Sequence, residues 1–232
     1  AMDKHKSGFL AIIGRANVGK STLINRILER KLSIIASKPH TTRNRIAGVK
    51  NYKNGQLIFL DTPGIHRGKS LINRYMVETA LETLKRVDAV LYMVDEFADP
   101  VEDRDYIFPR LASVDTPVLL LINKVDLVNK SKLLPLIDSY NKAFYFKEIL
   151  PLSALTGEGV DVLLDLCLGL LPEGPLYFPE GTYTDQPEDF LLSELIREKV
   201  IRLCREEVPY SVAVMVERVD RSRESAVDVD AI

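Results

Sequence analysis

The sequence feature that most constrains the fold is the stretch GRANVGKST, which runs from Gly14 to Thr22. It follows an apolar run of strand length, precedes a pattern of helical periodicity, and matches the spacing G-x-x-x-x-G-K-[ST]. Glycines let consecutive backbone N–H groups curl around an anion, and the N-terminus of the following helix adds partial positive charge. The stretch therefore predicts a loop that binds nucleotide phosphates. A glycine-rich strand-to-helix turn remains the alternative for the loop taken alone.

This loop supplies the first group of candidate site residues. Lys20 would reach the terminal phosphates, and the Ser21 hydroxyl would ligate Mg²⁺. The predicted phosphate-binding residues are Gly14, Arg15, Ala16, Asn17, Val18, Gly19, Lys20, Ser21 and Thr22. The loop identifies neither the base nor the purpose of the reaction.

Apolar runs of strand length alternate with helical periodicity over most of the chain, which predicts an α/β fold. The expected strands are 9–14, 45–52, 56–61, 89–95, 117–123 and 148–152. The expected helices are 20–29, 70–86, 101–113, 130–141 and 160–170. Asn54 and Gly55 favour a type I′ hairpin turn between the second and third strands. We expect a P-loop NTPase domain with a mixed, mostly parallel sheet, one antiparallel edge strand and helices on both faces.

A change of composition predicts a second domain. The segment LPEGPLYFPEGTYTDQPED is rich in proline, glycine and acidic residues, which is typical of a linker. We place a nucleotide-binding domain at 1–175, a linker at 176–187 and a partial α+β domain at 188–232.

The expected second domain contains one helix and two strands. Apart from Lys199, one face of its helix is apolar, with Leu192, Leu195, Ile196, Val200, Leu203 and Cys204. A strand is expected at 210–219, a polar turn at RSRES, and renewed strand alternation from Ala226. These elements are near the lower size limit for a core of their own, so we expect the domain to be incomplete here.

Composition argues against several classes of protein. A formal net charge of -2 over 232 residues gives no overall attraction to nucleic acid or membranes. Cys167 and Cys204 stand apart without C-x-x-C spacing, which argues against a disulfide framework or a structural metal site. The chain shows no signal-peptide pattern and no apolar run of membrane-spanning length, so we expect a cytoplasmic location.

Two further motifs each end a predicted strand. In DTPG, Asp61 could hold a Mg²⁺-bound water and the Gly64 N–H could sense the outermost phosphate. Alone, this motif more readily indicates a turn. In NKVD, from Asn123, the Asp126 carboxylate could accept hydrogen bonds from guanine N1–H and its 2-amino group, which adenine lacks, with Lys124 along the base. For NKVD alone, an ordinary loop is equally open.

Two weaker motifs complete the set. SAL, Ser153–Leu155, ends another strand, and the Ala154 amide could meet guanine O6. In KPHTTRNR, Thr42, or Thr41 as the second choice, could complete the Mg²⁺ shell when the third phosphate is present; a solvated basic loop is the alternative. All these motifs occur in the order of a guanine-nucleotide switch, and strand ends bring most of them to one edge of the sheet. The sequence therefore predicts GTP binding.

The chain resembles the Era GTPases. The resemblance rests on GRANVGKST, HTTRNR, DTPGIH, NKVD and SALTGEG, and after the linker on IREK and EVPYS. It implies a C-terminal KH domain that binds RNA, docking on the small ribosomal subunit and the 3′ end of its RNA during assembly, and slow hydrolysis of GTP to GDP and phosphate. The chain departs from the family at Ala16, where proline is common, and it lacks the KH G-x-x-G loop because no glycine follows Gly181.

Catalysis by such a site consists mostly of positioning and charge neutralisation. The expected catalytic residues are Lys20, Thr42 and Gly64. The expected metal ligands are Ser21, Thr42 and Asp61 for Mg²⁺ and Asn17 for K⁺. The K⁺ site is implied by the resemblance, and a turn residue with left-handed backbone is the alternative for Asn17. Ile65 stands where a water-orienting glutamine is usual, so intrinsic hydrolysis should be slow.

The expected partners are GTP or GDP and the RNA of the small ribosomal subunit. We expect the protein to be a monomer. A peripheral membrane contact is left open. Two alternatives compete with this hypothesis. One is a binding switch with negligible turnover. The other is a GTPase of tRNA modification, which would need C-terminal cysteine chemistry and a folate-type domain that this sequence lacks. NKVD argues against an ATPase.

Overall fold

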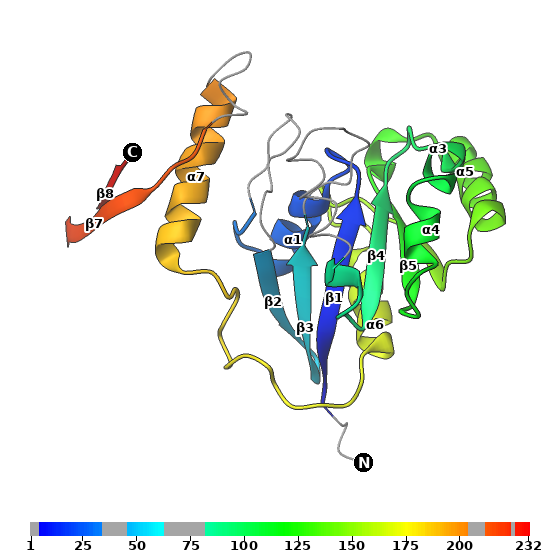
Figure 1. Ribbon diagram of the computed structural model, residues 1–232, viewed down its shortest axis with the longest axis horizontal. Helices are drawn as coiled ribbons and strands as arrows, with labels where there is room; N and C mark the ends of the chain where they lie inside the picture. The colour runs from blue at the N-terminus through cyan, green and yellow to red at the C-terminus, as the bar shows by residue number, and fades with distance from the viewer. Residues whose placement is uncertain (1–4, 34–45, 63–81, 204–211, 224–225) are drawn as a thin grey trace.

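The computed structural model describes residues 5–33, 46–62, 82–203, 212–223 and 226–232. In these ranges the chain forms a six-stranded sheet and a separate two-stranded sheet. Figure 1 shows the small sheet beside helix α7 (Glu188–Leu203), on the far side of the molecule from α5 (Lys130–Ala143). No helix of the described ranges is long and apolar enough to cross a membrane. Thr41, Thr42, Gly64 and Ile65 lie outside the described residues.

The six-stranded sheet has the order β2-β3-β1-β4-β5-β6. Its strands are β1 (Lys6–Gly14), β2 (Ile46–Tyr52), β3 (Gly55–Asp61), β4 (Ala89–Val94), β5 (Val118–Ile122) and β6 (Glu148–Pro151). Only β2 is antiparallel to its neighbour within this sheet. The prediction of a mostly parallel sheet with one antiparallel edge strand is confirmed.

The β2–β3 hairpin turns one residue earlier than predicted. Lys53 and Asn54 form the turn, with Lys53 at φ 50°, and Tyr52 pairs with Gly55 at the start of β3. Gly55 lies in β3 and not in the turn. Glycine is favoured there because a Cβ would lie 2.3 Å from Leu168 Cδ1 and 2.9 Å from the Lys6 carbonyl oxygen.

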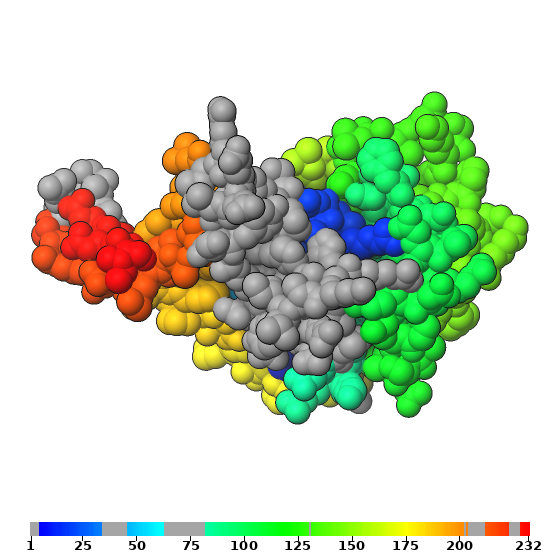
Figure 2. Space-filling model, turned by 45° about the horizontal axis from the view of Figure 1, so that its top comes forward, coloured from blue at the N-terminus to red at the C-terminus, as the bar shows by residue number. Residues whose placement is uncertain are grey.

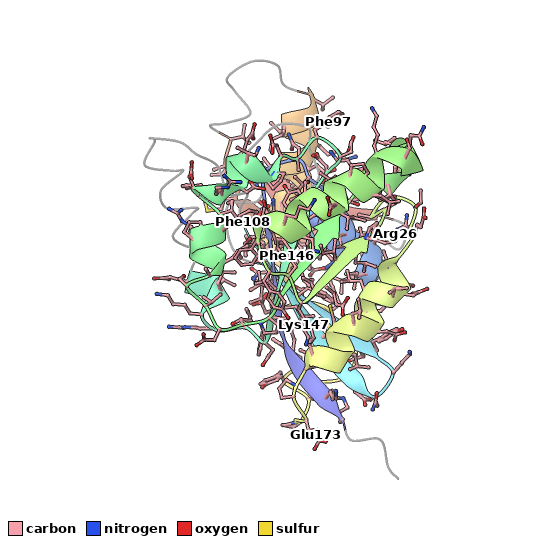
Figure 3. All side chains as sticks on the ribbon, turned by 90° about the vertical axis from the view of Figure 1, so that its right-hand side faces the viewer. Arg26, Phe97, Phe108, Phe146, Lys147 and Glu173 are labelled. Carbon is pink, nitrogen blue, oxygen red and sulfur yellow. The ribbon has the colours of Figure 1, made fainter. Side chains whose placement is uncertain are left out.

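Helices cover both faces of the sheet, as predicted. On one face α1 (Lys20–Leu28) and α6 (Val160–Leu170) pack against the sheet through residues such as Leu23 and Leu163. On the other face α4 (Phe108–Leu111) and α5 pack around Tyr140 and Phe146. Figure 3 shows Phe108 and Phe146 between the sheet and these helices, with ring centroids 6.2 Å apart. Burial on both faces explains why the central strands are apolar throughout.

The helix predicted at 101–113 is wrong as a single element. The chain forms α3 (Pro100–Arg104), a turn, and then α4. Pro109 has no N–H to donate to the Asp105 carbonyl, so the helical hydrogen-bond ladder is interrupted between the two. Of the helix predicted at 70–86, only 82–84 is described as helical, and 70–81 lies outside the described residues.

The segment predicted as a linker is bound along the edge of the sheet. The Val49 N–H donates to the Tyr183 carbonyl (2.9 Å), and Gly48 forms a β-bridge with Thr184. The buried Gln56 side chain accepts from the Tyr177 and Phe178 amides (2.9 Å each). The contacts of Gly48 and Val49 cover part of the outer edge of β2, which would otherwise present unpaired backbone groups.

Helix α7 buries charged residues, while part of its predicted apolar face stays exposed. Leu195 and Leu203 are exposed, whereas Glu194, Arg197 and Glu198 are buried. Arg197 donates to both carboxylate oxygens of Glu194 (2.7 and 2.8 Å), and Lys31 pairs with Glu198 at 2.7 Å. Because the buried charges are paired, their desolvation is offset in part.

The two-stranded sheet consists of β7 (Val216–Arg223) and β8 (Ala226–Ala231), which run antiparallel. The strand predicted at 210–219 therefore begins later than expected and extends into the predicted turn RSRES, because 212–215 are not in a strand. An α-helix followed by a small antiparallel sheet agrees with the predicted α+β unit. The boundaries at 175 and 187 stay predictions.

Candidate functional site

The loop between β1 and α1 has glycines where no other residue fits. A Cβ on Gly14 would lie 2.3 Å from the Met93 carbonyl oxygen, and one on Gly19, at φ 107°, would lie 2.2 Å from Asn123 Nδ2. Asn17 is exposed and also left-handed, at φ 64°. Such a loop directs successive backbone N–H groups toward one point, which suits an anion. The phosphate-binding assignments stay predictions that this geometry supports.

Lys20 is buried within this loop. Its Nζ donates to the carbonyl oxygens of Gly14 (3.1 Å) and Arg15 (2.8 Å). Burial lowers the pKa of Lys20 to about 8, although the negative charge of Asp61 acts in the other direction and raises it. The amine therefore loses its proton far more readily than an exposed lysine.

We expect GDP affinity to depend on pH through Lys20. Phosphate oxygens would raise the lysine pKa in the complex, so binding takes up a proton above a pH of about 8. Affinity should fall by about tenfold between pH 7 and pH 9. Calorimetric titration with GDP measures this change. Guanosine has the same ionising base without phosphates and is the control, so identical pH profiles for guanosine and GDP would contradict the prediction.

Two oxygen groups stand together beside the loop. The Ser21 hydroxyl donates to Asp61 Oδ2 at 3.0 Å, and Asp61 is fully buried at the end of β3. The next residue, Thr62, donates its hydroxyl to the Ile12 carbonyl (2.7 Å), which fixes the strand end against β1. Hydroxyl and carboxylate oxygens suit Mg²⁺, which typically takes one or two such ligands together with nucleotide phosphates. The residues present thus fit the predicted metal.

Asn123 joins the phosphate loop to the SAL segment. Its Nδ2 donates to the Val18 carbonyl (2.7 Å), and its Oδ1 accepts from the Ala154 amide (2.8 Å). The Ala154 N–H, which the sequence predicts to meet guanine O6, is thus engaged by Asn123. Contact with guanine would require that amide to share its hydrogen bond. Ser153 is fully buried, and its hydroxyl accepts from the Thr156 amide (3.1 Å).

The remaining predicted base-binding residues follow β5. Lys124 has a left-handed backbone at φ 65°, and its Nζ pairs with Asp95 at 2.8 Å. Asp126 is exposed in a short 3₁₀ turn (Val125–Leu127). Its carboxylate can therefore be reached by a ligand.

Sequence reasoning missed two contributors to this edge of the sheet. Asp95 follows β4 at the carboxyl edge, a position that could have identified it. Arg26 on α1 gave no such signal, yet it donates to the carbonyls of Ala154 (3.3 Å) and Leu155. Thr22 and Arg26 also line a cavity of about 510 Å³ next to this segment.

The carboxyl ends of the parallel strands point to the top of Figure 1. Figure 2 brings this edge forward and shows the blue surface of the early chain beside the green surface of the middle of the chain. Among the described site residues, the fold brings together the phosphate loop, Asp61, the NKVD segment and the SAL segment. Together they could hold a nucleotide from its base to its last phosphate.

Comparison with known proteins agrees with this geometry. Residues 9–124 match the model of a family described as 50S ribosome-binding GTPase. The GTPase Era of Geobacter sp. (strain M21) is 50% identical over 98% of this chain and 77% of its own length. A crystal structure of Era in complex with MgGDPNP and nucleotides 1506–1542 of 16S ribosomal RNA is similar, with a TM-score of 0.87, 40% identity, and coverage of 98% of this chain and 78% of that one.

A second solved structure is similar to the same degree. It is a single-residue variant of Aquifex aeolicus Era bound to GDP·AlF₄⁻, with a TM-score of 0.87 and 40% identity, covering 97% of this chain and 78% of that one. These likenesses include the small sheet after α7, because nearly the whole chain is covered.

Proposed function

The chain belongs to the Era family of GTPases, and from this premise we propose that it acts as a GTP-hydrolysing switch in assembly of the small ribosomal subunit, through binding of that subunit's RNA. The observation that carries the GTPase assignment is the convergence of the glycine loop, Asp61 and the NKVD segment at one edge of the sheet. The RNA assignment is supported by the relative that was crystallised with 16S ribosomal RNA.

The chain's own residues would bind and position the nucleotide. The loop amides and Lys20 would hold the phosphates, and Asp126 would accept two hydrogen bonds from guanine. Ser21 and Asp61, with Thr42, would hold Mg²⁺, which supplies charge neutralisation on the phosphate oxygens. Gly64 would sense the third phosphate.

The organisation proposed for the protein follows the sequence prediction. Residues 1–175 form the GTP-binding domain, 176–187 connect it to the second domain, and 188–232 belong to a KH-like RNA-binding unit. The protein would act as a monomer in the cytoplasm. A peripheral membrane contact is the remaining part of the proposal.

Sedimentation with ribosomal subunits tests the proposed role. The protein should sediment with small subunits in the presence of a non-hydrolysable GTP analogue and lose this association with GDP. Large subunits serve as the control particle, because the matching family is described as 50S ribosome-binding. Binding to large subunits alone, or to neither subunit in either nucleotide state, would overturn the ribosomal role and leave the GTPase chemistry intact.

We also propose that K⁺ accelerates hydrolysis through Asn17. Asn17 lies exposed in the phosphate loop, and an oxygen-ligated cation there would oppose the charge that develops on the phosphates. GTP turnover should be at least about tenfold faster in K⁺ than in Na⁺, equivalent to about 1.4 kcal/mol of barrier.

Asn17→Gly is the matched variant, because glycine tolerates the φ of 64° and removes only the side-chain amide. It should lose the K⁺ preference and keep its affinity for GDP. Equal rates in the two salts for the unmodified protein would refute a K⁺ site.

A further inference from the structure

A buried carboxylate outside the predicted site is bonded to the phosphate loop. Asp103, on the first turn of α3, is 1% exposed. Its Oδ1 accepts from Arg15 Nη2 (2.9 Å), and its Oδ2 accepts from the hydroxyls of Tyr92 (2.6 Å) and Tyr140 (2.8 Å). One carboxylate therefore connects the loop after β1 with α3, β4 and α5.

The three hydrogen bonds account for the burial of this charge. A buried carboxylate is costly unless it is paired and hydrogen-bonded, and Asp103 has one cationic and two hydroxyl donors. Burial and the nearby Asp103 charge raise the pKa of Tyr92 and Tyr140 above the usual range, so both remain donors. Burial opposes ionisation of Arg15, but Glu102 and Asp103 together raise its pKa, and the guanidinium stays charged.

The Asp103 carboxylate is held in one position because aromatic side chains pack around its two tyrosine partners. The Tyr92 and Tyr140 rings lie 6.4 and 6.3 Å from the Phe146 ring, centroid to centroid. Phe108 packs edge-on against Tyr140 at 6.3 Å. Closely packed side chains hold single rotamers, so the position of the carboxylate is set by the core.

Arg15 connects the Asp103 carboxylate to the backbone of the phosphate loop. Its guanidinium binds Asp103, while its backbone carbonyl accepts from Lys20 Nζ at 2.8 Å. Further along the loop, the Val18 carbonyl is held by Asn123 at 2.7 Å. The loop is thus fixed on both sides of Ala16 and Asn17. Groups fixed before the substrate arrives cost no reorganisation when charge develops.

We propose that Asp103 is a positioning residue for GTP hydrolysis, which holds the first half of the phosphate loop in its phosphate-binding geometry through Arg15. The proposal deepens the GTPase assignment and rests on the proposed role of the loop. Glu102 also pairs with Arg15, but its carboxylate is 60% exposed, so this pair is screened by solvent. The buried pair, and not the exposed one, should determine the loop geometry.

The test compares Asp103→Asn with the matched variant Glu102→Gln, each of which removes one negative charge next to Arg15. Affinities are measured for GTP, GDP and guanosine, together with kcat per nucleotide-binding molecule. Asp103→Asn should weaken GTP and GDP binding and lower kcat by about 10- to 100-fold, because small misplacements are costly in such sites. Guanosine affinity should not change, because the base is bound elsewhere. Glu102→Gln should change each value by less than about twofold.

The guanosine measurement separates positioning from general damage to the fold. An equal loss of affinity for all three ligands would indicate a merely structural role and overturn the proposal. Unchanged GTP binding and kcat in Asp103→Asn, or an equal effect of Glu102→Gln, would also overturn it. Asp103→Asn could disturb the packing of the Tyr92 and Tyr140 rings, so a second variant is measured. Arg15→Gln should show the same loss of GTP and GDP affinity and of kcat with unchanged guanosine affinity, and Arg15→Lys should restore part of what is lost.

Failure of the GTPase assignment would be distinguishable from failure of this proposal. In the first case the unmodified protein would not hydrolyse GTP. In the second it would hydrolyse GTP, and the Asp103 variant would behave like it.

Discussion

Replacing Asp126 with asparagine should move the base preference of this protein from guanine to xanthine. The carboxylate is exposed at the carboxyl end of β5, where it would accept hydrogen bonds from guanine N1–H and the 2-amino group. Xanthine has an oxygen in place of that amino group. An asparagine amide can donate to this oxygen and still accept from N1–H.

The size of this change follows from two charge-assisted hydrogen bonds. Each is worth about 1.5–3 kcal/mol. Asp126→Asn loses the bond to the 2-amino group and weakens the bond to N1–H from a charged to a neutral one, so GDP affinity should fall by about 10²–10³-fold. XDP should become the preferred ligand, and XTP should be hydrolysed. Displacement of a fluorescent nucleotide by GDP and XDP gives both affinities.

Asp126→Ala is the control, because it removes the acceptors without supplying a donor. It should lose GDP affinity and gain none for XDP. Retained guanine preference in Asp126→Asn would mean that the base is recognised by other residues.

Replacing Lys20 with methionine should abolish efficient hydrolysis without destabilising the protein. The lysine is buried, and its pKa is lowered to about 8 because burial disfavours the charged form. Removing one preorganised donor to a developing negative charge typically costs about 10²–10³-fold in kcat. Lys20→Met should lose at least this much and bind GDP more weakly.

Thermal unfolding without nucleotide provides the control for Lys20→Met. Because methionine carries no charge that burial would penalise, the variant should unfold at the same or a higher temperature than the unmodified protein. It should also lose the dependence of GDP affinity on pH. A variant that hydrolyses GTP normally would contradict the prediction. It would show that Lys20 has only a structural role, through its hydrogen bonds to the Gly14 and Arg15 carbonyls.

Much of the nucleotide domain was predictable because its sequence signals are local. Strand-length apolar runs indicated every strand of the six-stranded sheet, since a two-sided sheet buries both faces of each central strand. The glycine spacing from Gly14 to Ser21 indicated the loop, because a backbone that passes 2.3 Å from the position of a Cβ leaves no alternative residue. The break between α3 and α4 was missed, although Pro109 is a local signal for it.

Other features depend on segments that are far apart in the sequence. The region 176–187 has the composition of a linker, but Gln56 and the edge of β2 bind its backbone. Helix α7 shows an apolar stripe, but its buried residues include Glu198, which pairs with Lys31. Composition and periodicity report a segment's own side chains and not the partners it meets.

The sequence by itself determined the glycine loop, the order of the motifs along the chain and the candidate residues that would contact a guanine nucleotide. These signals are local, because each motif lies within a few residues of a strand end. Only the tertiary structure decided what fixes those residues in place. Asp103 reads as an ordinary acid in the first turn of a helix. Its contacts with Arg15, Tyr92 and Tyr140 span 88, 11 and 37 positions of the chain. Contacts of that separation arise from packing, because the energy of a buried charge depends on the partners that the whole fold brings to it.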